Sequence, residues 1–172
     1  MARGICMALH AVTEERMLEK IAIICQRTDV LYSYRHALIA WQGDVPIGLC
    51  LCYDGANYYE MRKTTFPLFS RIMGHEESHQ QMDLDNAEDE AVAGEYYMDS
   101  LAVMPSYRKM GVGFKLMQAQ LEKAWQMGFD KATLLVDPEN EPAQRLYKKL
   151  GFEHDGKVYA FGQYYWKWKK EK

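Results

Sequence analysis

Long apolar runs are absent from this sequence. No stretch approaches the roughly 20 consecutive apolar residues that a helix needs to cross a bilayer. Residues 1–15 also lack the small-residue cleavage site of a signal peptide. The formal net charge is only −3, which gives no general attraction to nucleic acid or to anionic lipid. We therefore expect neither a membrane nor a nucleic acid as a partner.

Cysteine is also sparse. The four cysteines show no C-x-x-C spacing. Cys50 and Cys52 would lie on the same face of a strand, but positions so close along one strand are poorly placed for a disulfide. Reduced, buried thiols are the rule in the cytoplasm. We therefore predict a cytoplasmic protein.

The composition is that of an ordinary globular protein. The 172 residues are 48% hydrophobic and 26% charged, and they contain no internal repeat or linker. A chain of this length buries a sizeable core in one domain and is barely long enough for two. We predict a single domain over residues 1–172.

Hydrophobic periodicity and turn residues divide the chain into strands that alternate with helices. This order indicates one mixed α/β domain. We expect Pro67 to break or offset the second helix. The expected strands are 5–12, a hairpin over 36–55 that turns at Gly43-Asp44, 95–103, 131–136 and 164–169, and the expected helices are 13–26, 56–74, 110–127 and 140–150.

The most specific stretch joins the strand at 95–103 to the helix that follows it. It reads Arg108-x-x-Gly111-x-Gly113. Glycines at a helix entrance let backbone N–H groups approach a ligand, and the positive end of the helix dipole favours an anion such as a diphosphate. Phe114 follows the second glycine, which excludes a P-loop, and Leu116 stands where a dinucleotide fold needs its third glycine.

A second motif follows the next strand. Residues 136–153 read VDPENEPAQRLYKKLGFE, with Asn140 as a helix N-cap, Pro142 in the first turn and Gly151 after the helix. The two motifs, in this order, resemble the GNAT superfamily of acyl-CoA-dependent N-acetyltransferases. The resemblance extends from about residue 95 to residue 152, and before that only the order of elements agrees.

The resemblance implies the GNAT fold, an α/β architecture with a mixed central sheet flanked by helices and with splayed strands at the cofactor site. It also implies acetyl-CoA as cosubstrate and no metal. The residues that match the family's cofactor-binding positions are Leu101, Ala102, Val103, Arg108, Lys109, Met110, Gly111, Val112, Gly113, Asn140, Ala143 and Tyr147.

The implied reaction is direct attack by a primary amine of a small molecule or peptide on the acetyl thioester. The resemblance implies that a backbone N–H near Val103 stabilises the carbonyl oxyanion. It also implies that Tyr147 donates a proton to the leaving thiolate. The base is open between Asp99 and Glu95, which alternate onto one face of their strand with Tyr97. The alternative function is a non-catalytic acyl-CoA-binding or sensor domain.

Residues 75–79 read His75-Glu76-x-x-His79, the spacing that holds zinc on a peptidase helix. That chemistry also needs an apolar back face and a third ligand. The flanking residues are polar and acidic, and the other three histidines have no motif relation to the pair. We predict a solvated insertion rather than a catalytic zinc site, with adventitious metal binding by the pair left open.

The same insertion is rich in acidic residues. A charge run of this kind is typically a solvated face, but above an acceptor site it would attract a cationic amine. We expect Tyr53, Tyr58 and Tyr59 either to pack in the core or on the surface, or to line an acceptor pocket. The aromatic final strand is either a homodimer seam or a covered sheet edge. The acidic residues of the run are Asp83, Asp85, Glu88, Asp89, Glu90 and Glu95.

Overall fold

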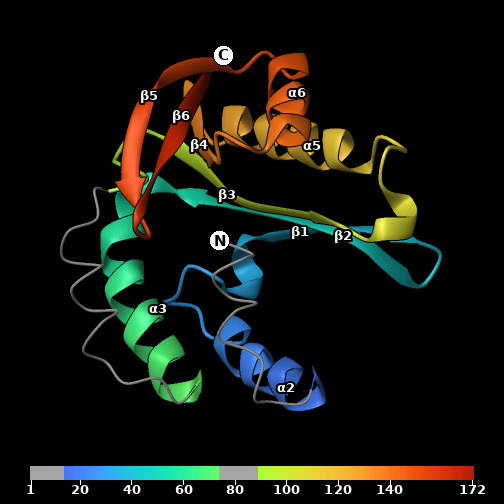
Figure 1. Cartoon of the computed structure of the whole chain (residues 1–172), viewed down its shortest axis with the longest axis vertical. Coiled ribbons are helices and arrows are strands. Elements are labelled where there is room, and N and C mark those ends of the chain that lie inside the picture. The colour runs from blue at the N-terminus through green and yellow to red at the C-terminus, as the bar shows by residue number, and fades with distance from the viewer. Residues whose placement is uncertain (1–13, 74–88) are drawn as a thin grey trace.

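The computed structural model describes residues 14–73 and 89–172. At its centre lies a six-stranded sheet with the strand order β1-β2-β3-β4-β6-β5 (Figure 1). Neighbouring strands are antiparallel except β3 and β4, which run parallel, so the predicted mixed sheet is confirmed. The strands are β1 (Ala37–Gln42), β2 (Val45–Asp54), β3 (Tyr96–Val103), β4 (Lys131–Val136), β5 (Glu153–Ala160) and β6 (Gln163–Glu171).

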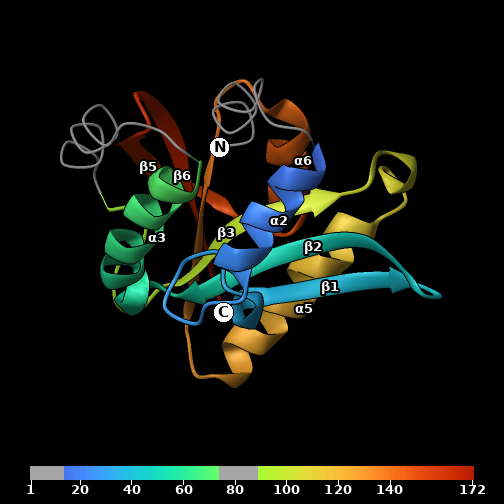
Figure 2. The same cartoon turned by 90° about the horizontal axis from the view of Figure 1, so that it is seen from below.

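Helices cover both faces of the sheet. Helices α5 (Val112–Gln126) and α6 (Glu141–Lys149) lie on one face, and α2 (Glu14–Cys25) and α3 (Tyr58–Met73) lie on the other, as Figures 1 and 2 show from two directions. The described part of the chain also contains three short 3-10 helices: η1 (Tyr34–His36), η2 (Gly55–Asn57) and η3 (Pro105–Tyr107). No described helix is both long and apolar enough to traverse a bilayer.

Local sequence signals account for most element boundaries. Asn140 caps α6 as predicted, because its side-chain oxygen accepts a hydrogen bond from the Ala143 N–H at 3.3 Å. Gly111, at φ +83°, precedes α5. The predicted strand over 5–12 and most of the predicted insertion, including the pair His75 and His79, fall outside the described residues. The single domain over 1–172 therefore stays a prediction.

The predicted break at Pro67 is wrong. Helix α3 runs through this residue without interruption. Proline cannot donate to the carbonyl of Lys63, four residues earlier. Lys63 and Pro67 are both exposed, so water can hydrogen-bond the carbonyl that proline leaves free. The opposite side of α3 buries Met61, Thr65 and Leu68, and this packing holds the helix together.

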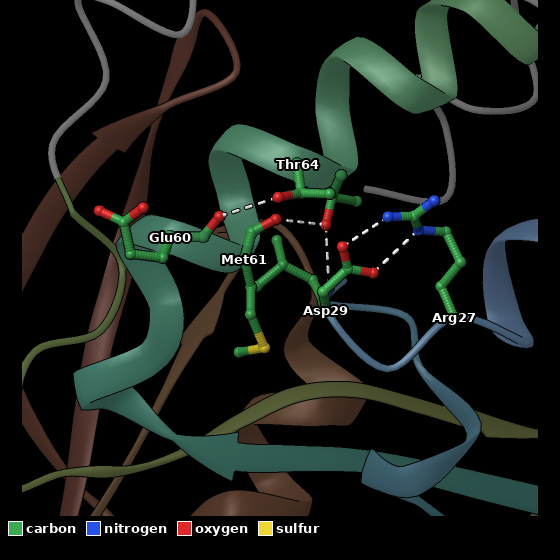
Figure 3. A network of polar contacts seen from close by, with 7 residues as sticks. Arg27, Asp29, Glu60, Met61 and Thr64 are labelled. Carbon is green, nitrogen blue, oxygen red and sulfur yellow. Dashed lines mark hydrogen bonds and ion pairs between the residues drawn. The ribbon is translucent and has the colours of Figure 1, made fainter.

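A polar network ties the loop after α2 to α3 (Figure 3). Arg27 donates from Nε to Asp29 Oδ1 at 2.8 Å within that loop. The backbone N–H of Leu31 donates to the Thr65 hydroxyl at 2.8 Å, and this buried hydroxyl donates in turn to the Met61 carbonyl at 2.6 Å. Because Leu31 is anchored, the next residue of the loop is held against the sheet, where it reaches the pocket described below.

The two parallel strands separate along their length. Strands β3 and β4 pair only at Tyr96 with Ala132 and at Tyr97 with Thr133. Beyond these pairs the strands diverge, so the side of β3 that faces β4 has no strand partner within residues 14–73 and 89–172. The predicted splay is confirmed. The final strand β6 is not an edge strand, because it lies between β4 and β5.

Candidate active site

A pocket of about 370 Å³ opens where β3 and β4 diverge. Polar and aromatic side chains from distant parts of the sequence line it. Three of the predicted site residues with a polar side chain are among them: Asp99, Asn140 and Tyr147. The lining residues are Tyr32, Glu90, Tyr97, Asp99, Ser100, Leu101, Ala102, Leu135, Val136, Asp137, Asn140, Tyr147, Phe161 and Tyr165.

A β-bulge at Asp99 sets the direction of the side chains on β3. Leu51 pairs with Ser100 and the next residue, Cys52, pairs with Met98, so Asp99 is the extra residue. Met98 and Leu101 both pack into the core beside α5, although residues three apart face opposite ways in a regular strand. The bulge therefore lets Asp99 and Ser100 together line the pocket.

The far end of β3 packs closely against the start of α5. A Cβ at Gly113 would lie 3.5 Å from a Leu101 methyl carbon and 3.6 Å from one of Val103. The structure thus brings together Leu101, Val103 and Gly113, which the family resemblance assigned to one cofactor site. Leu101 and Ala102 also line the pocket.

The turn between η3 and α5 leads directly into the N-terminus of a long helix. Lys109 and Gly111 in this turn have left-handed φ values, +62° and +83°. The first N–H groups of α5 have no acceptor within the helix, and the positive end of the helix dipole favours an anion there. Arg108 donates from Nε to the Val103 carbonyl at 3.1 Å, so its guanidinium lies beside the same turn.

Helix α6 brings Asn140 and Tyr147 to the pocket, and Ala143 packs beside them, half-buried, at the edge of the core. The Tyr147 ring contacts Phe152 and Trp168, with centroids 6.1 Å and 6.5 Å away. Among the described residues, the Tyr147 hydroxyl has no hydrogen-bond partner. Burial raises the pKa of this phenol to about 12, so it stays protonated at neutral pH.

Glu90 is the most consequential pocket residue that sequence reasoning missed. It was expected in a solvated acidic run, but only 4% of it is exposed. Tyr58 and Tyr97 donate hydrogen bonds to its two carboxylate oxygens at 2.8 Å and 2.6 Å. Burial, and next the charge of Asp99, raises the pKa of Glu90 to about 7. A carboxylate with this pKa exchanges its proton readily near neutral pH.

Asp99 is the second carboxylate of the pocket. Tyr53 donates to Oδ2 at 2.7 Å and Ser100 donates to Oδ1 at 2.8 Å. Burial raises the pKa of Asp99, while these two hydrogen bonds oppose the rise. Of the three tyrosines noted in the sequence, Tyr53 and Tyr58 therefore hold the carboxylates, whereas Tyr59 is exposed.

The position of Glu90 depends on a close approach at Gly55. The Gly55 N–H donates to the Glu95 carbonyl at 2.8 Å, and a Cβ on Gly55 would collide with the Val92 carbonyl oxygen. Only glycine lets the turn over residues 92–95 dock here. On the other side of Glu90, Arg62 pairs with Asp89 at 3.2 Å.

Glu95 lies outside the lining of the pocket. Its carboxylate bonds Lys131 at 2.8 Å, Lys167 at 2.9 Å and the Thr133 hydroxyl at 3.0 Å. Burial raises its pKa, but the hydrogen bonds from Lys131, Lys167 and Thr133 and the charge of Lys167 together lower the pKa by more. This arrangement ties β3, β4 and β6 together and keeps the carboxylate charged.

The sequence held a weak signal for Glu90. The residues after it, Ala91 and Val92, interrupt the acidic run, and Ala91 is buried. Tyr32, Leu135, Phe161 and Tyr165 were also missed, because nothing local marks them as pocket residues. No group of three or more metal-binding side chains occurs within residues 14–73 and 89–172.

A family comparison agrees with this geometry. The model of the Acetyltransferase (GNAT) family matches residues 8–152. The chain belongs to this family. The match covers both motifs, the splayed strands and Glu90, so the GNAT fold and the GNAT family membership expected from the sequence are confirmed.

Individual proteins resemble this GNAT chain over different lengths. A mycothiol acetyltransferase of Corynebacterium aurimucosum is 40% identical over 67 residues, which are 39% of this chain and 21% of that protein. The chain matches between 21% and 43% of the length of the curated relatives.

Solved structures match over more of the chain. An acetyltransferase crystal structure has a TM-score of 0.72 and 26% identity, covering 93% of this chain and 82% of that one. An N-acetyltransferase of Staphylococcus aureus Mu50 has a TM-score of 0.69, with 24% identity and coverage of 93% and 83%. The second similarity, at this identity, concerns the fold alone.

Proposed function

We propose that this GNAT-family chain transfers the acetyl group of acetyl-CoA to a primary amine. The observation that carries the proposal is one pocket between the splayed strands, which brings β3 residues of the expected cofactor site together with carboxylates. Its lining includes Leu101 and Ala102 of β3, the buried carboxylate of Glu90 and the partly buried carboxylate of Asp99. A thioester and an amine could meet between them.

The residues at the C-terminal end of β3 and in the turn that follows suit acetyl-CoA as a substrate. The turn at 108–113 offers backbone N–H groups and two cationic side chains to a pyrophosphate. The side of β3 at 101–103 that has no strand partner among the described residues offers backbone groups to an extended chain of amides, in the manner of an added strand, while the Val103 carbonyl already accepts from Arg108. Asn140 lines the pocket, and Ala143 lies next to it at the edge of the core. These assignments follow the family resemblance.

Glu90 is the proposed general base, with Asp99 beside it. A primary ammonium has a pKa near ~10.4 and must lose a proton before it attacks. Glu90 takes that proton, the amine nitrogen bonds to the thioester carbonyl carbon, and the carbon–sulfur bond breaks. The second amine proton ends on the departing thiolate, so the products are an amide, a thiol and one proton released later from Glu90. Asp99 keeps its negative charge and stabilises the entering cation.

Tyr147 is proposed to hydrogen-bond the leaving sulfur. Its pKa of about 12 exceeds that of a thiol, which is near ~8.5. Complete transfer of the phenol proton is therefore unfavourable, whereas a hydrogen bond to the developing thiolate stabilises it. Its hydroxyl has no hydrogen-bond partner among the described residues and so need not break a bond to act.

The acceptor is proposed to be cationic. Among the described residues, the pocket lining contains three carboxylates, Glu90, Asp99 and Asp137, and no lysine, arginine or histidine. A substrate that carries its own carboxylate next to the reacting amine would be repelled by these three side chains. The sequence-based expectations of a cytoplasmic setting and a homodimer also remain proposals, the first supported by the free thiols of Cys25, Cys50 and Cys52.

Thiol release from acetyl-CoA tests the function. The purified protein is mixed with acetyl-CoA and a panel of primary amines, and free thiol is titrated. We expect amine-dependent release together with the acetylated amine. Thermal stabilisation by CoA without thiol release from any amine would instead indicate a non-catalytic acyl-CoA-binding domain.

A further inference from the structure

The turn between β5 and β6 holds a phenylalanine in a conformation that this residue rarely adopts. Ala160 pairs with Gln163, so Phe161 and Gly162 form a two-residue loop. Their φ values are +52° and +78°. Hairpin turns with two positive φ values favour asparagine, aspartate or glycine at the first position, and a bulky residue there is an outlier.

Burial of the ring does not explain this choice. The Phe161 ring contacts Phe66 on α3, with centroids 5.9 Å apart, yet 40% of Phe161 remains exposed. Burial of the remaining part of the ring stabilises the turn, but the left-handed backbone costs a comparable amount. Packing thus offsets the strain and gives no net reason to prefer phenylalanine over asparagine or glycine at this position. Strained backbone of this kind occurs mainly at functional sites.

The ring of Phe161 belongs to the lining of the pocket that also contains Glu90 and Asp99. Tyr32 and Tyr165 line it as well, so aromatic rings and the two carboxylates line the same pocket. An ammonium group is attracted both to carboxylates and to the face of an aromatic ring. The turn therefore sets a rigid, apolar surface where the carbon chain of an amine would enter.

We propose that Phe161 is the specificity-determining residue for the acceptor, selecting a primary ammonium on an unbranched alkyl chain over one branched next to the nitrogen. The inference rests on the proposed acetyl transfer. The ring contacts the methylene groups beside the ammonium, and a branch at the first carbon collides with it. Replacing Phe161 with asparagine keeps the turn conformation and removes the ring.

The test compares n-butylamine with sec-butylamine, which have the same composition and charge and differ only in the branch. For the wild type we expect kcat/KM for n-butylamine to exceed that for sec-butylamine by about tenfold or more. Phe161→Asn should reduce this ratio by about tenfold, through the KM of the amine, and leave the KM of acetyl-CoA unchanged. The same variant should melt within about 3 °C of the wild type, because the strain that it relieves and the packing that it loses are comparable.

Three further variants sharpen the result. Phe161→Gly should repeat the effect of asparagine, and Phe161→Tyr should keep the wild-type ratio. Tyr164→Ser removes an exposed aromatic of the same hairpin that does not line the pocket, and it should also keep the ratio. An unchanged ratio in an active Phe161→Asn variant overturns the inference alone. Failure of the wild type to acetylate any amine overturns the proposed function, and the inference with it.

Discussion

The hydroxyl of Tyr97 lies 2.6 Å from Oε2 of Glu90, although the two residues belong to different segments, one on β3 and the other before it. Tyr58 donates to the other oxygen from α3. Two phenols thus hold a carboxylate that burial and Asp99 keep close to a pKa of 7. The hydrogen bonds orient the Glu90 carboxylate, and burial raises its proton affinity. Both effects suit this carboxylate to accept a proton.

The raised pKa of Glu90 predicts a loss of stability with rising pH. Below about pH 4.5 the carboxyl is protonated in the folded and unfolded states alike. Between about pH 4.5 and pH 7 the unfolded chain releases the proton and the folded chain keeps it, so the free energy of unfolding falls by at most roughly 3 kcal/mol. Glu90→Gln should remove this fall and be more stable than the wild type at pH 8, measured by urea unfolding.

Asp89→Asn serves as the control for that measurement. Asp89 is the neighbouring carboxylate, but it pairs with Arg62 outside the pocket lining. The control should keep the pH-dependent fall of the wild type. If Glu90→Gln kept it too, the burial of Glu90 would not perturb its ionisation in the way described.

Tyr147→Phe should separate catalysis from packing. The ring contacts with Phe152 and Trp168 survive the change, and the lost hydroxyl has no hydrogen-bond partner among the described residues. We expect kcat to fall by about 10²-fold and the melting temperature to stay unchanged. Tyr159→Phe, outside the pocket lining, should alter neither quantity. Full activity in Tyr147→Phe would remove the proposed role at the leaving sulfur.

Gly111→Ala should weaken acetyl-CoA binding. The added Cβ meets no atom within 4 Å, so the effect must come from the backbone, whose φ is +83°. A side chain in this region costs about 1–2 kcal/mol, and a turn that shifts to avoid the cost misaligns its N–H groups. We expect a Kd about tenfold higher by calorimetry. Gly128→Ala has a similar φ of +91° and equally open surroundings, but it follows the other end of α5 and should leave the Kd unchanged.

Glu95→Gln should affect stability rather than chemistry. The change leaves Lys131 and Lys167 without their carboxylate, and Lys167 is largely buried. We expect a loss of about 3 kcal/mol in urea unfolding. The folded variant should retain kcat/KM within about twofold, since Glu95 does not line the pocket. A variant of normal stability and no activity would restore Glu95 as a candidate base.

The elements that the sequence predicted correctly carry local signals. Gly111 and Asn140 act through conformations and hydrogen bonds within a few residues of themselves. Their effects can be inferred before the chain is folded. For the same reason the hairpin at Gly43-Asp44 and the strand at 131–136 were predicted where they occur.

The unpredicted features depend on contacts between distant segments. Glu90 becomes a pocket residue because Gly55 admits the turn that follows it and because Tyr58 and Tyr97 bond its carboxylate. The bulge at Asp99 changes which side chains face the pocket, and strict alternation along β3 does not show it. Pro67 is tolerated because its side of α3 happens to face water.

The most direct measurement of the role of Glu90 is the ratio of kcat/KM for the wild type to that for Glu90→Gln, taken with n-butylamine from about pH 5.5 to about pH 9. The ionisation of the amine is common to both proteins and cancels in the ratio. We predict that the ratio rises with pH, with an apparent pKa near 7, to a plateau of about 10² or more. A ratio that stays close to one, or that does not change with pH, would contradict proton removal by Glu90.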